Sequence, residues 1–181
     1  VGALLLGLAL SQALFGPLSD SLGRKPIILF GFGLFALGSL LSIWAPNFEW
    51  MLIGRFVQGF GLAAPRVAVV AVVRDRFEGR QMARTTSLIM TFFILVPAVA
   101  PTVGQMILAF ADWHGIFWMF IVAAVGIGLW TKLRLPETLS DRYRHPLSFR
   151  RVGTAFVEVV RNRMAMGYLL AVSCLLSGLF G

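Results

Sequence analysis

Six long apolar runs, separated by short polar segments, constrain the fold of this chain more than any other feature of its 181 residues. A helix needs about 20 residues to cross the hydrocarbon core of a bilayer, and the runs are 18 to 27 residues long. Only 13% of the residues are charged, against about 25% in soluble domains. The sequence therefore predicts an all-α polytopic membrane protein with spans at 1–18, 27–45, 50–73, 85–111, 115–133 and 164–181.

Basic residues gather on one side of the predicted membrane. Fourteen of the 16 lysines and arginines follow the first, third and fifth runs, whereas the segments 46–49 and 112–114 contain none. Cytoplasmic loops carry an excess of lysine and arginine, so we expect the first run to pass from outside to inside. Because the sequence starts and ends within apolar runs, we expect a longer protein. The direction of the first run implies at least one helix before Val1 if the N-terminus is cytoplasmic.

The segment 134–163 is the one long polar connection in the sequence. It separates a predicted N-terminal bundle, 1–133, from 164–181, which we interpret as the start of a second bundle. We expect 134–163 to be a cytoplasmic linker that carries an amphipathic helix on the membrane surface. The apolar residues that follow helical spacing there are Phe149, Val152, Phe156, Val159 and Val160.

Composition and motifs argue against several classes of protein. The net charge of +8 does not indicate nucleic-acid binding, because the bases lie at the ends of apolar runs and form no stripe or aromatic-interleaved patch. A single cysteine, Cys174, excludes an internal disulfide, and His114 and His145 lie in turns away from other metal ligands. The sequence contains no phosphate loop, zinc-protease motif or nucleophile elbow. We therefore expect no enzyme, no metal and no cofactor.

The segment 16–26 reads Gly-Pro-Leu-Ser-Asp-Ser-Leu-Gly-Arg-Lys-Pro and combines turn-forming residues with one acid and two bases. This composition predicts a charged turn between the first two spans. The bases would hold the turn in the cytosol. Asp20 can pair with those bases or with the end of a neighbouring helix.

Two arginines lie inside the third run, where a charged side chain costs at least about 2.5–3.5 kcal/mol. Arg55 and Arg66 are eleven residues apart, so they return to nearly the same helical face about 16 Å apart. Gln58 and Gly59 share this face. Such a face is expected to look into protein or a water-filled cavity. Alternatively, Arg55 reaches the outer interface by snorkelling, and Arg66 donates to carbonyl groups of a neighbouring helix.

Two further runs carry packing signals. Pro97, Pro101 and Gly104 interrupt the fourth run and predict either a kinked, tightly packed helix that controls a pathway or an ordinary packing kink. No Asp or Glu lies within a predicted span. If the protein moves protons, the carboxylate that binds them would therefore lie outside these residues. In the first run, small residues at four-residue spacing predict a packing face that consists of Ala3, Gly7, Ala9 and Ala13.

Taken together, these motifs resemble those of the major facilitator superfamily of transporters. The segment 16–26 is similar to the loop between the second and third helices of that family. The segment 55–61 looks like the fourth-helix motif of its drug:proton antiporters, and 97–104 resembles their fifth-helix motif. The residues that point more narrowly to the Bcr/CflA-type drug resistance subfamily are Arg74-Asp75, Pro97-Ala98-Val99-Ala100-Pro101, Trp113 and Ile116-Phe117-Trp118.

The resemblance covers essentially the whole chain and implies a partial transporter fold. The chain would supply helices 2 to 7 of twelve, without helix 1, so that 164–181 is the first helix of the C-terminal bundle. A cytoplasmic charge latch for the outward-facing state is implied for Asp20, Arg24, Lys25 and Asp75, with Arg24 bridging to Asp75 and Asp20 meeting a helix N-terminus.

The resemblance also implies roles within the membrane. Arg55 would lie in the central cavity and lower the pKa of a nearby carboxylate by its positive charge. The other residues implied to line the cavity are Gln58, Gly59 and Arg66. Pro97, Pro101 and Gly104 would bend the fifth helix against the other half of the protein and limit leak.

The function implied by the resemblance is the export of small drug-like molecules in exchange for protons, by alternating access between two halves. The protein would be a multi-pass protein of the bacterial inner membrane and a monomer at full length. Its partners would be a small-molecule substrate, protons and the lipid bilayer, and not nucleic acid. Two alternatives stay open: a proton-coupled importer of a small solute with the same fold, and a truncated membrane protein that transports nothing.

Overall fold

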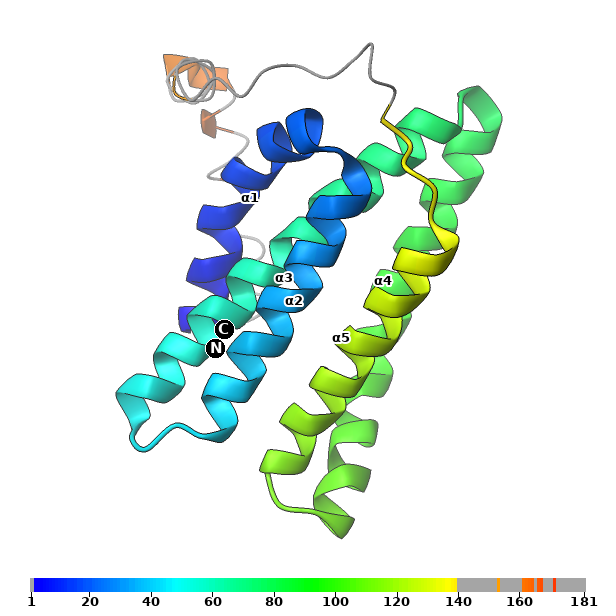
Figure 1. Ribbon diagram of the computed structural model, residues 1–181. Coiled ribbons are helices and arrows are strands. Elements are labelled where there is room, and N and C mark those ends of the chain that lie inside the picture. Colours follow the sequence, from blue (N-terminus) through cyan, green and yellow to red (C-terminus); the bar gives the residue numbers. More distant parts are fainter. Residues whose placement is uncertain (1, 140–152, 154–160, 165, 168–170, 172–181) are drawn as a thin grey trace. The chain divides into compact units, whose positions relative to one another are not determined.

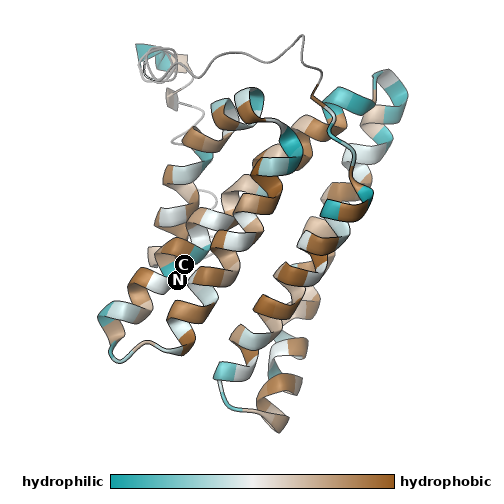
Figure 2. Cartoon of the chain, in the orientation of Figure 1, coloured by the Kyte–Doolittle hydropathy of each residue, from teal (hydrophilic) through white to brown (hydrophobic). Residues whose placement is uncertain are grey.

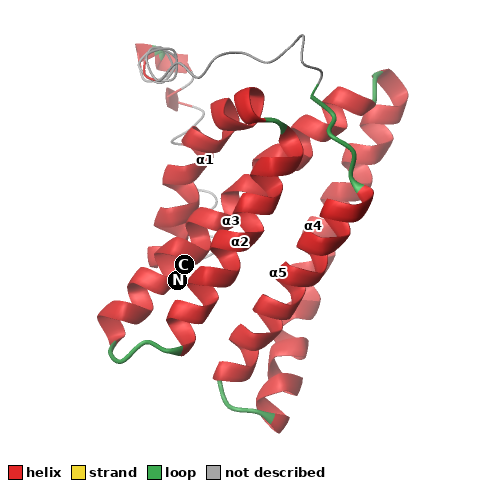
Figure 3. Cartoon of the chain, viewed as in Figure 1, coloured by secondary structure: helices red, strands yellow, loops and turns green. Residues whose placement is uncertain are grey.

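The computed structural model describes residues 2–139, 153, 161–164, 166, 167 and 171. Within this part, the long regular elements are the helices α1 (Gly2–Leu22), α2 (Arg24–Ile43), α3 (Phe48–Arg76), α4 (Gly79–Phe110) and α5 (His114–Arg134), and Figure 3 shows no strand among the residues it colours. All five helices are long and apolar enough to cross a membrane. The predicted all-α class is therefore confirmed. The sixth predicted span and the predicted surface helix fall largely outside the described residues.

The chain forms two compact units, Val1–His145 and Pro146–Gly181, and the five helices belong to the first. Polar residues in this unit gather at the helix ends and turns, while the helix flanks are mainly apolar, as Figure 2 shows. Most large apolar side chains on the flanks are exposed in the chain itself. That distribution is expected of helices whose solvent is lipid rather than water.

The prediction of a turn over 16–26 is wrong, because helix occupies almost the whole segment. Helix α1 continues through Pro17 to Leu22, and α2 begins at Arg24. Gly23 alone makes the connection, with a φ of 105° that side-chain-bearing residues rarely adopt. Pro26 lies in the first turn of α2, where a missing backbone N–H leaves no helical hydrogen bond unmade.

Helix α3 packs closely against both α1 and α2, and α5 packs on the far side of α2 (Figure 1). Glycines make the close approaches possible, as is usual between membrane helices. A Cβ at Gly38 of α2 would overlap the backbone of Gln58, and a Cβ at Gly59 of α3 would overlap the carbonyl of Leu4. Between α2 and α5, the rings of Phe35 and Phe120 lie 5.9 Å apart.

The packing face of α1 differs from the predicted one. Gly7 is buried as expected, but Ala9 and Ala13 are exposed in the structure. The buried residues of α1 follow a four-residue spacing that begins at the same glycine: Gly7, Ser11, Phe15 and Ser19. The spacing of glycine and alanine therefore identified one buried residue of this face, Gly7. It missed the other three because they are serine and phenylalanine.

Helix α4 runs without interruption through Pro97 and Pro101. None of its residues is buried, and it contacts α3 and α5 only sparsely. Its exposed flank includes Phe92, Phe93 and Val96. The fourth predicted span is thus a single helix with both prolines inside it.

Candidate functional site

Arg55 begins a chain of hydrogen bonds that crosses from α3 to α2. Its Nη1 donates to Oε1 of Gln58, 3.2 Å away, one turn further along α3. Nε2 of Gln58 donates to Oγ of Ser39 on α2 at 2.8 Å. Oγ of Ser39 donates in turn to the carbonyl oxygen of Phe35 at 2.8 Å. Gln58 and Ser39 have no exposed surface, so this chain satisfies polar groups that would otherwise be costly to bury.

The guanidinium of Arg55 also lies against an aromatic ring of α5. Its Cζ is 4.6 Å from the ring centroid of Phe117, which is 3% exposed. A cation over an aromatic face gains about 0.5–2 kcal/mol. The ring is held in turn by edge contacts to Trp113 and Phe120, with centroids 5.8 and 6.2 Å away. Three helices thus fix one positive charge inside the bundle.

Among the described residues, the contacts of Arg55 are an amide and an aromatic ring rather than a carboxylate. These neighbours orient the guanidinium without neutralising it. The half-buried cation can therefore attract an anionic group, or lower the pKa of a carboxylate that comes within reach.

The other two residues predicted for the cavity lie elsewhere. Gly59 is buried where α3 meets α1, next to the backbone of Leu4. Arg66 is exposed in the chain and lines a separate cavity between α1 and α3. Among the four predicted cavity residues, all within the described part of the chain, Arg55 and Gln58 are the pair joined by a hydrogen bond.

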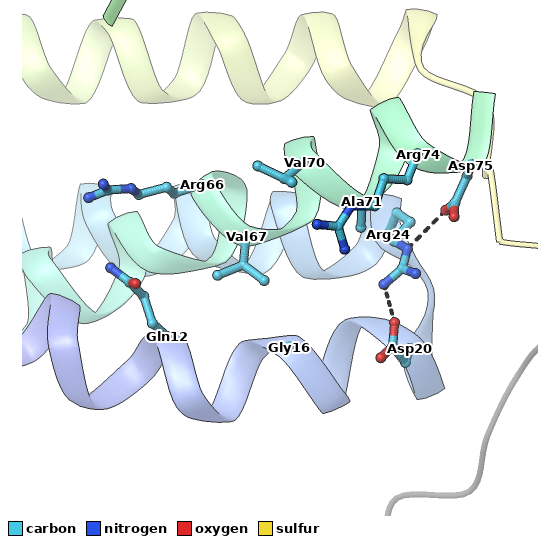
Figure 4. A pocket seen from close by; sticks show the side chains of 10 residues that line it. All are labelled: Gln12, Gly16, Asp20, Arg24, Arg66, Val67, Val70, Ala71, Arg74 and Asp75. Atoms are coloured by element: carbon cyan, nitrogen blue, oxygen red, sulfur yellow. Dashed lines mark hydrogen bonds and ion pairs between the residues drawn. The ribbon is translucent and has the colours of Figure 1, made fainter. Parts of the chain in front are cut away.

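The charged residues around the junction of α1 and α2 form a second site, which we call the charge cluster: Asp20, Arg24 and Asp75. Nη1 of Arg24 lies 2.5 Å from Oδ1 of Asp20, and its Nε lies 3.1 Å from Oδ2 of Asp75. Nη1 also donates to Oγ of Ser19 at 2.5 Å. The guanidinium is thereby bound to both α1 and α3, and Figure 4 shows it between the two carboxylates.

The charge cluster lies at one end of a cavity of about 440 Å³. In Figure 4, Gln12 and Arg66 lie at the other end. Arg74 also lines the cavity. Because Arg24 is paired twice, Arg66 and Arg74 supply the positive charge along the remaining wall. The full lining consists of Gln12, Gly16, Asp20, Arg24, Arg66, Val67, Val70, Ala71, Arg74 and Asp75.

The remaining predicted residues are placed more simply. Lys25 was predicted to belong to the charge latch. In the structure, its backbone N–H donates to a carboxylate oxygen of Glu137. Pro97 and Pro101 are exposed on α4, and a Cβ at Gly104 would meet no atom within 4 Å. No group of three His, Cys, Asp or Glu residues in the described ranges could hold a metal ion.

Sequence reasoning missed Glu137, which follows the end of α5. Its Oε1 accepts from the backbone N–H of Arg24 at 2.9 Å, and its Oε2 accepts from that of Lys25 at 3.1 Å. In the sequence, Glu137 is one of several charged residues in the polar segment 134–163. Its place after Leu135-Pro136, where α5 has ended, was the available signal. Ser39 was missed for a different reason, since one serine in an apolar run gives no sign of its partner.

The comparisons with known proteins cover nearly the whole chain. The sequence profile of the Major Facilitator Superfamily matches residues 1–181. An uncharacterized MFS-type transporter, YdgK, of Bacillus subtilis (strain 168) is 37% identical over 180 residues, which are 98% of this chain and 45% of the relative. A bicyclomycin resistance protein homolog of Haemophilus influenzae is 36% identical over 174 residues, 96% of this chain and 44% of the relative. A multidrug resistance protein, MdtL, of Shewanella sp. (strain ANA-3) is 31% identical over 150 residues, 83% of this chain and 38% of the relative.

The chain spans less than half the length of these curated relatives. The matched family consists of transporters, which are not enzymes. Together with five helices that are apolar enough to span a bilayer, the match indicates a multi-pass membrane protein. Because the profile covers every residue and the relatives align along most of the sequence, the chain belongs to the Major Facilitator Superfamily.

Proposed function

We propose that this chain is part of a proton-driven exporter of small drug-like molecules in the inner membrane of a bacterium. The exporter would work by alternating access between two six-helix halves, with these residues supplying its second to seventh helices. The observation that carries the proposal is Arg55, an arginine held inside the bundle by Gln58 and Phe117. The relatives named for bicyclomycin and multidrug resistance support drugs as the substrate class.

In this proposal, Arg55 acts on a proton-binding carboxylate contributed by a neighbouring helix. A positive charge within about 4–6 Å favours the ionised carboxylate and lowers its pKa by roughly 1–3 units. Release of the proton would then be coupled to binding of the drug. The charge cluster would close the cytoplasmic side in the outward-facing state, and Pro97, Pro101 and Gly104 would pack α4 against the second half.

The test expresses the full-length transporter in a bacterium that lacks its own efflux pumps. Resistance to bicyclomycin or another drug of a panel should rise, and outward flux of a fluorescent drug should stop when an uncoupler dissipates the proton gradient. Arg55→Ala should abolish efflux at an unchanged amount of membrane-inserted protein. Arg84→Ala, which removes an exposed arginine of α4, serves as the control and should export normally. Inward flux, or normal resistance in Arg55→Ala, would overturn the proposal.

A further inference from the structure

The amino end of α2 is capped by a residue far away in the sequence. Gly23, which precedes the helix, has no side chain that could accept from the first free N–H groups. Glu137 accepts from Arg24 and Lys25 instead, with one oxygen to each, across 113 and 112 residues. A carboxylate at this position is favoured both by hydrogen bonding and by the positive end of the helix dipole.

The same carboxylate orders the chain that follows α5. Its Oε1 also accepts from the backbone N–H groups of Thr138 and Leu139, both at 3.0 Å. Burial alone raises the pKa of Glu137, but the four N–H donors together outweigh it, so the pKa lies below its ordinary value. Two of these four hydrogen bonds join Glu137 to the start of α2, and the other two order the residues that follow it.

Gly23 leaves the space that this contact requires. A Cβ built on Gly23 would lie 2.7 Å from Oε2 of Glu137, in addition to the strain of a positive φ. Contacts this short are essentially never made by real Cβ atoms. The glycine thus serves the approach of the carboxylate as well as the sharp connection between α1 and α2.

Arg24 links the Glu137 contact to the charge cluster. Glu137 binds the backbone of Arg24, while Asp20 and Asp75 bind the side chain of the same residue. The hydroxyl of Thr138 donates to Oδ2 of Asp75 over a longer distance of 3.4 Å. The first residues of the linker therefore touch the backbone of Arg24 and one of its two acidic partners.

We propose that Glu137 is a positioning residue that ties residues 137–139 to the charge cluster, so that these residues and the cluster move as one unit. Glu137 holds Arg24 where Asp20 and Asp75 can both reach it. Its contribution to a transport cycle rests on the proposed export function, whereas the anchoring itself does not.

The anchoring is tested by amide hydrogen exchange of the full-length protein in detergent. Glu137→Ala should accelerate exchange at Arg24 and Lys25 by about tenfold or more, the effect of losing one hydrogen bond to a charged group. Glu137→Gln keeps one acceptor oxygen and should accelerate exchange less. This conservative variant keeps the test valid if Glu137→Ala does not fold. The matched control is Glu78→Ala, because Glu78 precedes α4 without capping it. Unchanged exchange at α2 in both Glu137 variants would overturn the anchor.

The positioning role is tested by separating drug binding from turnover in the same variants. Glu137→Ala should lower the turnover of efflux at an unchanged Kd for the drug, with partial rescue in Glu137→Gln and no effect in Glu78→Ala. A rise in Kd, or normal turnover despite faster exchange, would remove the role in transport. If the wild-type protein exports nothing, the proposed function fails, and the exchange experiment still decides whether Glu137 anchors the linker.

Discussion

Gln58 has both ends of its amide hydrogen-bonded although none of its surface is exposed. Loss of its acceptor on α2 should therefore be costly. Ser39→Ala leaves the buried Nε2 of Gln58 without a partner, and we expect the free energy of unfolding to fall by about 1–3 kcal/mol. Thermal unfolding of the purified protein in detergent measures this.

Ser42→Ala is the matched control for that substitution. Ser42 is equally buried on the same helix, but its hydroxyl donates only to the carbonyl of Gly38 within α2. Its removal leaves no side chain unpaired, so the loss should be clearly smaller. Equal effects of Ser39→Ala and Ser42→Ala would contradict the role of the Gln58 contact.

At the scale of the helices, α2 and α3 approach closely because glycines line their interface. Gly38→Ala would push a Cβ into the backbone of Gln58, and overpacking of this kind costs about 1–3 kcal/mol. Gly33→Ala, on the same helix, meets nothing within 4 Å and should leave the melting temperature unchanged or slightly higher. An equally mild effect of both substitutions in the same detergent would mean that the two helices can separate without loss.

The contact between α2 and the residues after α5 should depend on pH. The lowered pKa of Glu137 means that its stabilisation is fully present above the ordinary value of 4.5 and is lost as pH falls through the lowered value. The charged groups at this contact are Arg24 and Asp75. Melting temperatures measured from pH 7 to pH 3 should fall less steeply below about pH 4.5 in Glu137→Gln than in wild type or Glu78→Gln. Identical pH profiles would contradict the assignment.

The five spans that the structure describes were predictable from sequence, because lipid imposes a length and a composition that are visible in each run. The residues at which the helices begin and end were less predictable. The predicted turn around Asp20 is mostly helix, since the turn signals of Gly16 and Pro17 are overridden when a membrane helix continues through them. Likewise, Arg74 and Arg76 do not lie in a loop. They lie in the last turn of α3, where their positive charges complement the helix dipole.

The candidate sites were predictable only as far as each residue stands out against its surroundings. Arg55 is visible as a charge in an apolar run, and the resemblance named Asp75 as a partner for Arg24. Ser39 is recognised only by the side chain that it touches, 19 residues away. The position of Glu137 after α5 is visible in the sequence, but its partner Arg24 lies 113 residues away. Contacts between helices depend on register and rotation, which a single apolar pattern does not specify.

At the scale of the whole molecule, the charge cluster joins α1, α2 and α3 at one end of the bundle. Asp20→Lys would place a like charge beside Arg24 and break the contact between α1 and α2. We expect slower turnover of drug export in the full-length transporter, with insertion preserved and a smaller effect in Asp20→Asn. Stopped-flow efflux measurements test this, and normal kinetics in Asp20→Lys would exclude a latch at this position.

Proton-driven export is tested most directly in liposomes that contain the full-length transporter with its cytoplasmic side outward. An acidic interior should drive uptake of a labelled drug while an internal dye reports loss of protons. We expect uptake to stop with an uncoupler and to be absent in Arg55→Ala but normal in Arg84→Ala. Uptake that is the same without a pH gradient, or that persists in Arg55→Ala, would contradict proton-coupled export through the site at Arg55.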